Sequence, residues 1–89
     1  MATRKIKDPD AVLDYDWDWA TWLGSDTITS STMTAEAGIT VDSSSNTTTL
    51  ATATLSGGTA GKQYEVTNRV VTAGGRTEDR TLIVYIRER

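Results

Sequence analysis

The sequence contains no cysteine and no histidine in its 89 residues. Without cysteine, no disulfide can brace the fold and no thiolate can act as a nucleophile or metal ligand. Without histidine, the commonest general base and the usual zinc ligand are also missing. A chain of this length forms one domain and buries a modest share of its surface. Packing and hydrogen bonds alone must therefore hold it together.

Phenylalanine is absent as well, proline occurs once, and threonine is abundant. Threonine is β-branched, so it suits a pleated strand better than a helix. The glycines lie between the runs of alternating residues, where turns are expected. The composition therefore predicts an all-β domain with many turns.

Long apolar runs are missing too. No stretch is long or apolar enough to span a membrane, and no apolar core of a signal peptide follows the basic start. The net charge of −3 argues against a protein that holds nucleic acid through its phosphates. We therefore expect no membrane partner, no nucleic-acid partner, and synthesis in a cytoplasm.

The charges that are present are segregated along the chain. Residues 1–10 are polar and begin basic, and we interpret them as an arm that is flexible in isolation, ahead of a domain at 11–89. Opposite charge on different segments favours contacts between copies or with partners. The arm and the acidic stripe after it supply candidate interface residues: Arg4, Lys5, Lys7, Asp14, Asp16 and Asp18.

Alternation of apolar and polar residues predicts the strands. A strand is expected at 12–19, followed by a single helical turn at 20–23. The serine-rich residues 42–46 read as a turn. Further strands are expected at 26–35, 39–41, 47–55, 64–72 and 81–87. The number and spacing of these runs predict a single immunoglobulin-like antiparallel β-sandwich of about six or seven strands.

Tyr64 stands at a strand start, directly after a loop that contains Gly57, Gly58 and Gly61. In immunoglobulin-like sandwiches a tyrosine at this place covers the preceding loop, and its hydroxyl bonds to the loop backbone. Gly74 and Gly75 are expected to form the hairpin turn between the last two strands. We assign all these residues structural roles.

The last hairpin predicts a contact surface. If Tyr64, Val66 and Val70 face the core, then Val71 faces outward together with Arg69. In the last strand Ile83 and Tyr85 face outward as well, near Arg87. Apolar, aromatic and arginine side chains on adjacent strands are typical of protein interfaces. These five outward residues complete the set of interface candidates.

Three tryptophans lie within six residues: Trp17, Trp19 and Trp22. Core or subunit-interface packing is one interpretation, and the helical turn would place Trp19 beside Trp22. A platform on which sugars stack is the other. Calcium binding by the acidic stripe is not favoured, because carboxylates two residues apart on a strand lie ~7 Å apart. No pair of groups converges for acid–base catalysis, so we expect no cofactor, no metal and no enzyme.

Several motifs resemble those of a known protein family, and together they extend from Lys7 to Arg89. They are Leu13-Asp14-Tyr15, Asp18-Trp19, Trp22-Leu23, Asp26-Thr27-Ile28, the loop Leu55-Ser56-Gly57-Gly58-Thr59-Ala60-Gly61 with Tyr64-Glu65-Val66-Thr67, Gly74-Gly75-Arg76, and Asp79-Arg80. They are similar to a family of small tailed-bacteriophage virion proteins described as fiber–tail adaptors or tail connectors. The resemblance implies an immunoglobulin-like sandwich without catalytic residues, present as a repeated subunit of the virion.

We therefore expect a non-enzymatic virion protein that links tail or portal components to fibers or to the head. It would be present in several copies and be assembled in the cytoplasm of the host bacterium. Two alternatives remain open. One is a carbohydrate- or ligand-binding immunoglobulin-like module that uses the tryptophan-rich first strand. The other is a protein that decorates the capsid.

Overall fold

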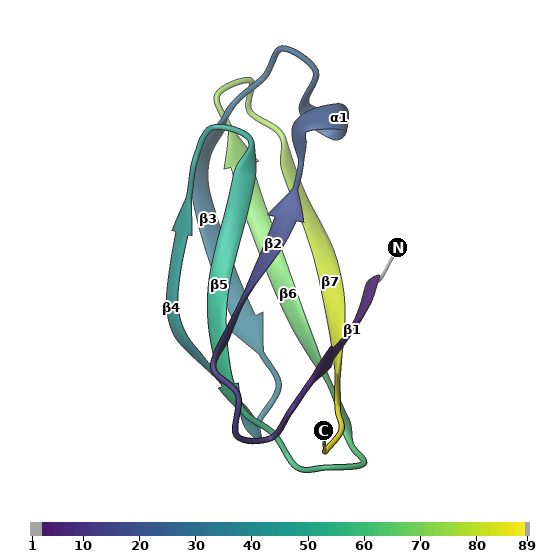
Figure 1. The fold of residues 1–89 in the computed structure, drawn as a ribbon. Coiled ribbons are helices and arrows are strands. Elements are labelled where there is room, and N and C mark those ends of the chain that lie inside the picture. The colour runs from purple at the N-terminus through teal and green to yellow at the C-terminus, as the bar shows by residue number, and fades with distance from the viewer. Residues whose placement is uncertain (1–2, 89) are drawn as a thin grey trace.

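The computed structural model describes residues 3–88, which fold into two β-sheets packed face to face (Figure 1). Sheet A has the strand order β1-β7-β6-β3, and sheet B has the order β2-β5-β4. The elements are β1 (Thr3–Lys7), β2 (Leu13–Asp18), α1 (Ala20–Leu23), β3 (Ile28–Ala35), β4 (Ile39–Asn46), β5 (Leu50–Gly57), β6 (Gln63–Thr72) and β7 (Thr77–Ile86). The predicted all-β sandwich is confirmed, and its immunoglobulin-like character stays a prediction.

The first strand differs from the prediction of a separate arm. Thr3–Lys7 forms β1, which pairs in parallel with the second half of β7, from Leu82 to Ile86. The remaining strand pairs are antiparallel. A boundary after residue 10 would cut β1 away from the sheet that it completes. The parts of the predicted arm and domain at residues 1, 2 and 89 lie outside the described residues.

The core forms where the inward faces of the two sheets meet. As the alternation predicts, β6 buries Tyr64, Val66, Asn68 and Val70, and β7 buries Leu82, Val84 and Ile86. In sheet B the large rings of Tyr15 and Trp17 lie opposite Ala53 and Ala51 of β5. A small residue opposite each large ring lets the side chains fill the space between the two sheets without steric overlap, as dense packing requires.

Strand β4 is longer than the sequence predicts. It continues from Ile39 through the serine cluster to Asn46 and pairs with β5 along its length. A register shift between Val41 and Ser43 marks a bulge. Serine prefers turns locally, so the sequence alone did not predict a strand here. The backbone hydrogen bonds between β4 and β5 outweigh that preference. The turn lies instead at Thr47, whose N–H donates to the carbonyl of Leu50 at 2.8 Å.

The loop before β6 closes over Tyr64 as the sequence predicts. The backbone N–H of Thr59 donates to the Tyr64 hydroxyl at 3.0 Å. Gly58 has a positive φ of 97°, and a Cβ there would lie 2.5 Å from Cδ1 of Ile86. Only glycine therefore allows the loop to lie this close to the end of β7.

Candidate functional site

The outer face of sheet A carries a continuous apolar patch. Ile6 of β1 lies opposite Tyr85 of β7. Ile83 precedes Tyr85 by two residues on β7 and therefore faces the same side of the sheet. Ile6 is 41% exposed, whereas Ile83 and Tyr85 are half-buried by their neighbours. We call these three residues the sheet A patch. The sequence indicated Ile83 and Tyr85 but missed Ile6, because β1 was not recognised as a strand of this sheet.

Polar side chains border the sheet A patch. Arg4 lies opposite Ile83, and its Nη2 donates to Oε1 of Gln63 at 3.2 Å. Glu65 lies opposite Ile83 on the β6 side. A small apolar centre with a polar rim has the composition of a protein contact surface.

The other predicted residues of this face lie apart from the patch. Val71 pairs with Thr77 near the far end of β6 and β7. Between Val71 and the patch, Arg69 forms an ion pair with Asp79 at 2.8 Å, and both side chains are largely exposed. Arg87 follows β7 and is exposed, with its backbone N–H donating to the carbonyl of Lys7. The five outward residues predicted from the sequence therefore lie on one side of sheet A but do not form one continuous surface. They are Arg69, Val71, Ile83, Tyr85 and Arg87.

Lys7 is buried, with no exposed surface. Its Nζ donates to the carbonyl oxygens of Asp8 and Gly57, both at 2.8 Å. Burial lowers the pKa of Lys7, although nearby carboxylates act in the opposite direction. The side chain links the turn after β1 to the end of β5. It therefore stabilises the fold and is not available for the surface contact that the sequence suggested.

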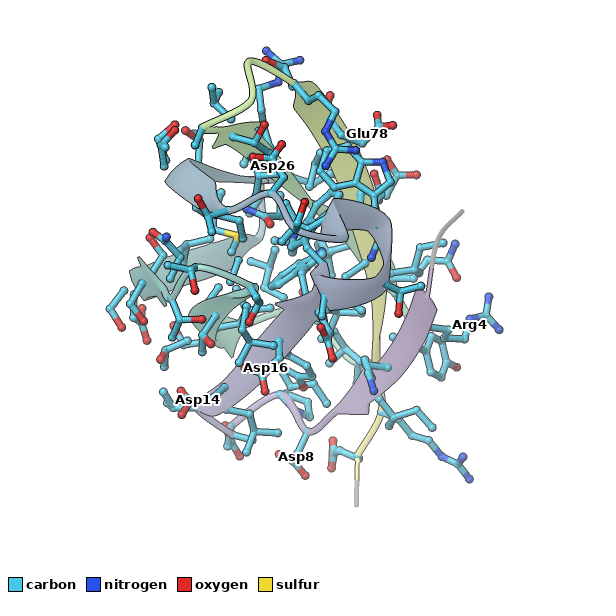
Figure 2. The ribbon with its side chains drawn as sticks, turned by 90° about the horizontal axis from the view of Figure 1, so that it is seen from above. Arg4, Asp8, Asp14, Asp16, Asp26 and Glu78 are labelled. Carbon is cyan, nitrogen blue, oxygen red and sulfur yellow. The ribbon has the colours of Figure 1, made fainter. Side chains whose placement is uncertain are left out.

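The acidic stripe lies on the outer face of sheet B. Asp14 and Asp16 accept hydrogen bonds from Thr54 and Thr52, which lie directly opposite them on β5. Figure 2 shows Asp14 and Asp16 on one side of the molecule and Arg4 well away from them. The three strands of sheet B contain no lysine or arginine, so nothing within the sheet neutralises this face. Asp42 of β4 accepts from Ser56 and adds a carboxylate that sequence analysis missed.

Two of the three tryptophans are buried, with Trp17 5% and Trp19 0% exposed. Trp19 lies 5.2 Å from Trp22, ring centre to ring centre, in an edge-to-face arrangement, which confirms their predicted proximity. The guanidinium of Arg80 lies over the Trp19 ring at 4.2 Å. Rings covered in this way offer no open platform for a sugar. The structure therefore gives no support to the carbohydrate-binding alternative.

Arg76 and Asp26 fasten α1 to the hairpin between β6 and β7. Arg76 donates to Oδ2 of Asp26 at 3.1 Å and to the carbonyl of Leu23 at 2.9 Å, and it also lies over the Trp22 ring. A hydrogen bond from the Thr72 side chain lowers the pKa of Asp26 to about 2, with help from backbone N–H groups and Arg76. The backbone N–H of Gly74 is one of these donors, at 2.9 Å. These contacts of Arg76 and Asp26 hold α1 against the hairpin and have a structural role.

Residues 3–88 contain no group of three or more acidic, histidine or cysteine side chains that could hold a metal ion. The carboxylates of Asp14 and Asp16 are instead bonded to threonine hydroxyls. No helix in this part of the chain is long and apolar enough to cross a membrane. The features that stand out chemically are thus the two outer faces of the sandwich.

Comparison with known proteins identifies one family. The model of a family described as podophage GP4 fiber-tail adaptor protein gp77 matches residues 7–85, which is nearly the whole chain. The match confirms the resemblance seen in the sequence motifs. No curated protein matches the chain.

Proposed function

Because the chain belongs to the podophage GP4 fiber-tail adaptor family, we propose that it is a non-catalytic virion protein that joins tail components to fibers. The proposal assigns one outer face of the sandwich to each class of partner. The sheet A patch binds one partner, and the acidic face of sheet B binds a positively charged surface on another. The two faces lie on opposite sides of a thin domain, as an adaptor requires.

The sheet A patch is the observation that carries this proposal. Ile6, Ile83 and Tyr85 come from two adjacent strands and share one face of the sheet. Ile6 is exposed, and Ile83 and Tyr85 beside it are half-buried. Exposed apolar residues grouped with arginine and tyrosine mark binding surfaces more often than scattered ones do.

The acidic face of sheet B supports a second contact. Asp14, Asp16 and Asp18 project from one strand, with Asp42 on the same sheet. Because the strands of sheet B carry no lysine or arginine, these carboxylates would steer a basic partner toward the face and discourage an acidic one. Contact through this face would be weakened by salt, whereas contact through the apolar patch would not.

We extend the proposal to assembly. The protein would be present in several copies per particle, enter the virion in the host cytoplasm, and also contact portal or head components. The segregation of charge along the chain supports contacts between copies, because β1 of sheet A carries basic residues and β2 of sheet B carries acidic ones.

A complementation experiment tests the role of the patch. A phage that lacks the gene is supplied with the wild-type protein or with the double variant Ile6→Ser and Tyr85→Ser. We expect the variant to fold, with an unchanged circular dichroism spectrum, and to be incorporated into particles about tenfold less than wild type. A tenfold loss corresponds to about 1.4 kcal/mol of binding free energy, which lies within the range of interface residues whose truncation costs more than about 1 kcal/mol.

Val12→Ser is the matched control, because Val12 is 59% exposed and lies outside the sheet A patch. It should be incorporated normally. Normal incorporation of the double variant would contradict the assignment of this face.

A further inference from the structure

A pocket opens between β2 of sheet B and β7 of sheet A, at the edge of the sandwich where these two strands belong to different sheets and are not paired. Its volume is about 260 Å³. This lies below the ~300–1,000 Å³ of pockets that enclose small-molecule ligands. A single side chain of another protein is a better match for its size. The lining residues are Lys5, Asp16, Trp17, Asp18, Arg80, Thr81 and Leu82.

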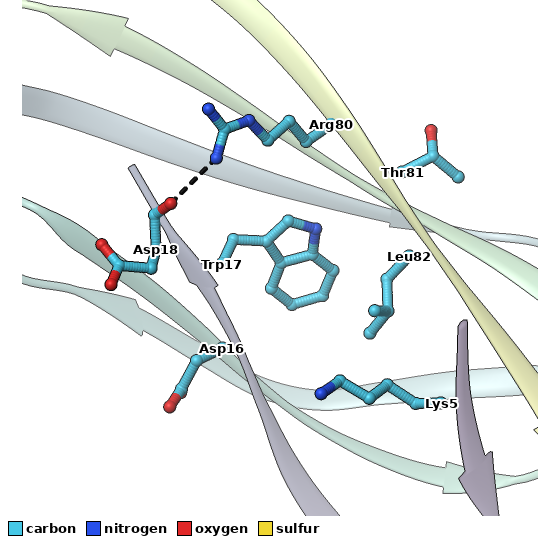
Figure 3. A pocket seen from close by; sticks show the side chains of 7 residues that line it. All are labelled: Lys5, Asp16, Trp17, Asp18, Arg80, Thr81 and Leu82. Carbon is cyan, nitrogen blue, oxygen red and sulfur yellow. Dashed lines mark hydrogen bonds between the residues drawn. The ribbon is translucent and has the colours of Figure 1, made fainter. Parts of the chain in front are cut away.

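The indole nitrogen of Trp17 has no hydrogen-bond partner, although the residue is 95% buried, with 5% of its surface exposed. Figure 3 shows the Trp17 ring extending from β2 toward β7, with its nitrogen on the side of Thr81 and Arg80. A buried N–H without a partner costs about 1–3 kcal/mol. The other buried tryptophan, Trp19, does not bear this cost, because its indole N–H donates to Asn68 at 2.9 Å. The unpaired N–H therefore requires an explanation.

Two cationic side chains line the same pocket, with Arg80 on the side of the Trp17 nitrogen and the Lys5 ammonium on the opposite side of the ring (Figure 3). Lys5 comes from β1 and Arg80 from β7, and both line the pocket. Arg80 is held in place by its bond to the Asp18 carbonyl at 2.8 Å and by its contact with the Trp19 ring. The carboxylates of Asp16 and Asp18 point away from the Trp17 ring (Figure 3). Asp16 accepts from Thr52, and Asp18 accepts from the N–H of Ala20. Donors therefore face the interior of the pocket.

The neighbouring edge of β7 suits an extended segment. β1 pairs with Leu82–Ile86, whereas Thr77–Thr81 pairs, among the described residues, with β6 alone. Strands with such open edges accept another chain by adding its backbone to the sheet. A segment added here would carry alternate side chains toward the pocket.

We propose that this pocket binds the carboxylate of an aspartate or glutamate carried by an extended segment of a partner protein. The carboxylate accepts a hydrogen bond from Nε1 of Trp17 and is attracted by the positive charges of Arg80 and Lys5, which line the same pocket. Charge-assisted bonds of this kind are stronger than neutral ones, which makes the contact selective for an acidic residue. The inference rests on the proposed adaptor function and adds a partner site distinct from the sheet A patch.

The test uses the full-length protein and two blocked peptides, acetyl-Thr-Val-Glu-Val-Thr-amide and the same peptide with glutamine in place of glutamate. The indole N–H signals are followed by NMR as each peptide is added to millimolar concentration. We expect the Trp17 signal to shift with the glutamate peptide and the Trp19 signal to stay in place. The glutamine peptide should bind at least about fivefold more weakly, since hydrogen bonds to charged groups are the stronger ones.

Two variants separate the donor from the shape of the pocket. Replacement of Trp17 by benzothienylalanine keeps the ring size and removes the N–H, and it should lower affinity for the glutamate peptide about tenfold. Lys5→Ala should lower that affinity and leave binding of the glutamine peptide unchanged. Both proteins should unfold at the same urea concentration as wild type or at a higher one.

The proposal is overturned if neither peptide moves the Trp17 signal, or if both peptides bind equally well. It is also overturned if the benzothienylalanine protein binds as tightly as wild type. Each result is independent of the particle-incorporation assay, so a failure here does not bear on the sheet A patch. Loss of incorporation in the patch variant with no peptide binding would support the adaptor function alone.

Discussion

Trp19 and Asn68 join the two layers of the sandwich inside the core. Trp19 directly follows β2, and its Nε1 donates to Oδ1 of Asn68 in the middle of β6 at 2.9 Å. The amide nitrogen of Asn68 donates in turn to the Ser31 hydroxyl and to the carbonyl of Thr32. Both residues have no exposed surface. A buried polar group costs little only when its partners are complete, and here they are.

We expect Trp19→Phe to reduce the free energy of unfolding by about 2 kcal/mol more than Trp17→Phe does. Both variants remove the same ring volume, but only the first leaves the Asn68 oxygen without its donor. Urea unfolding followed by circular dichroism measures the difference. Equal losses of stability would show that the Trp19–Asn68 bond contributes nothing.

We expect Gly58→Ala to destabilise the fold more than Gly61→Ala. Both glycines have positive φ, which costs an L-residue about 1–2 kcal/mol. At Gly58 the new methyl group would also lie 2.5 Å from Cδ1 of Ile86, whereas nothing lies within 4 Å at Gly61. Overpacking of this kind adds about 1–3 kcal/mol. Thermal unfolding of the two variants side by side measures the difference, and a similar Tm for both would contradict the contact.

Because the pKa of Asp26 is about 2 in the folded protein, the free energy of unfolding depends on pH in the acidic range. The ordinary value is 3.8, so the unfolded chain takes up this proton first as the pH falls. The stabilisation is therefore complete above about pH 4 and is lost progressively between pH 4 and pH 2. Asp26→Asn should be less stable than wild type at pH 6 and should lose less further stability on acidification. Urea unfolding at several pH values measures this, and parallel pH profiles would refute it.

Deletion of residues 1–7 should destabilise the whole domain and not merely weaken assembly. It removes the strand that covers Leu82–Ile86 and the Lys7 side chain that links the carbonyls of Asp8 and Gly57. We expect Lys7→Ala alone to cost about 1–3 kcal/mol, because it removes both hydrogen bonds of a buried charged side chain. Lys5→Ala is the control, since Lys5 is exposed. A deletion variant with wild-type urea sensitivity would restore the interpretation of this segment as an arm.

The sequence predicted best where alternation and burial agree. Between Tyr64 and Val70 of β6 and between Leu82 and Ile86 of β7, each inward residue is apolar or, at Asn68, has hydrogen-bond partners in the core. The period of two therefore identified both strands and their faces. The tyrosine after the glycine loop was equally clear. Local sequence was sufficient in these places because the pattern and the packing coincide.

It failed where the deciding contacts are distant in sequence. The sequence of β1 predicts a polar arm, since the buried side chain among residues 4–7 is a lysine. The partners of this lysine lie on the turn after β1 and at the end of β5. The serine run of β4 reads as a turn, and only its pairing with β5 makes it a strand. The pocket beside Trp17 combines residues from three strands that are distant in sequence. The spacing of these residues along the chain therefore does not predict the pocket.

The pairing of the first strand with the last affects how the chain folds as it is made. β1 emerges from the ribosome before β2 to β7, and its partner β7 is translated about 80 residues later. Contacts of such long sequence separation form slowly, because a long loop must close before they yield any stability. Sheet A therefore reaches its final form only after synthesis has passed Ile86, because β7 lies between β1 and β6 and both strands lack this partner until then.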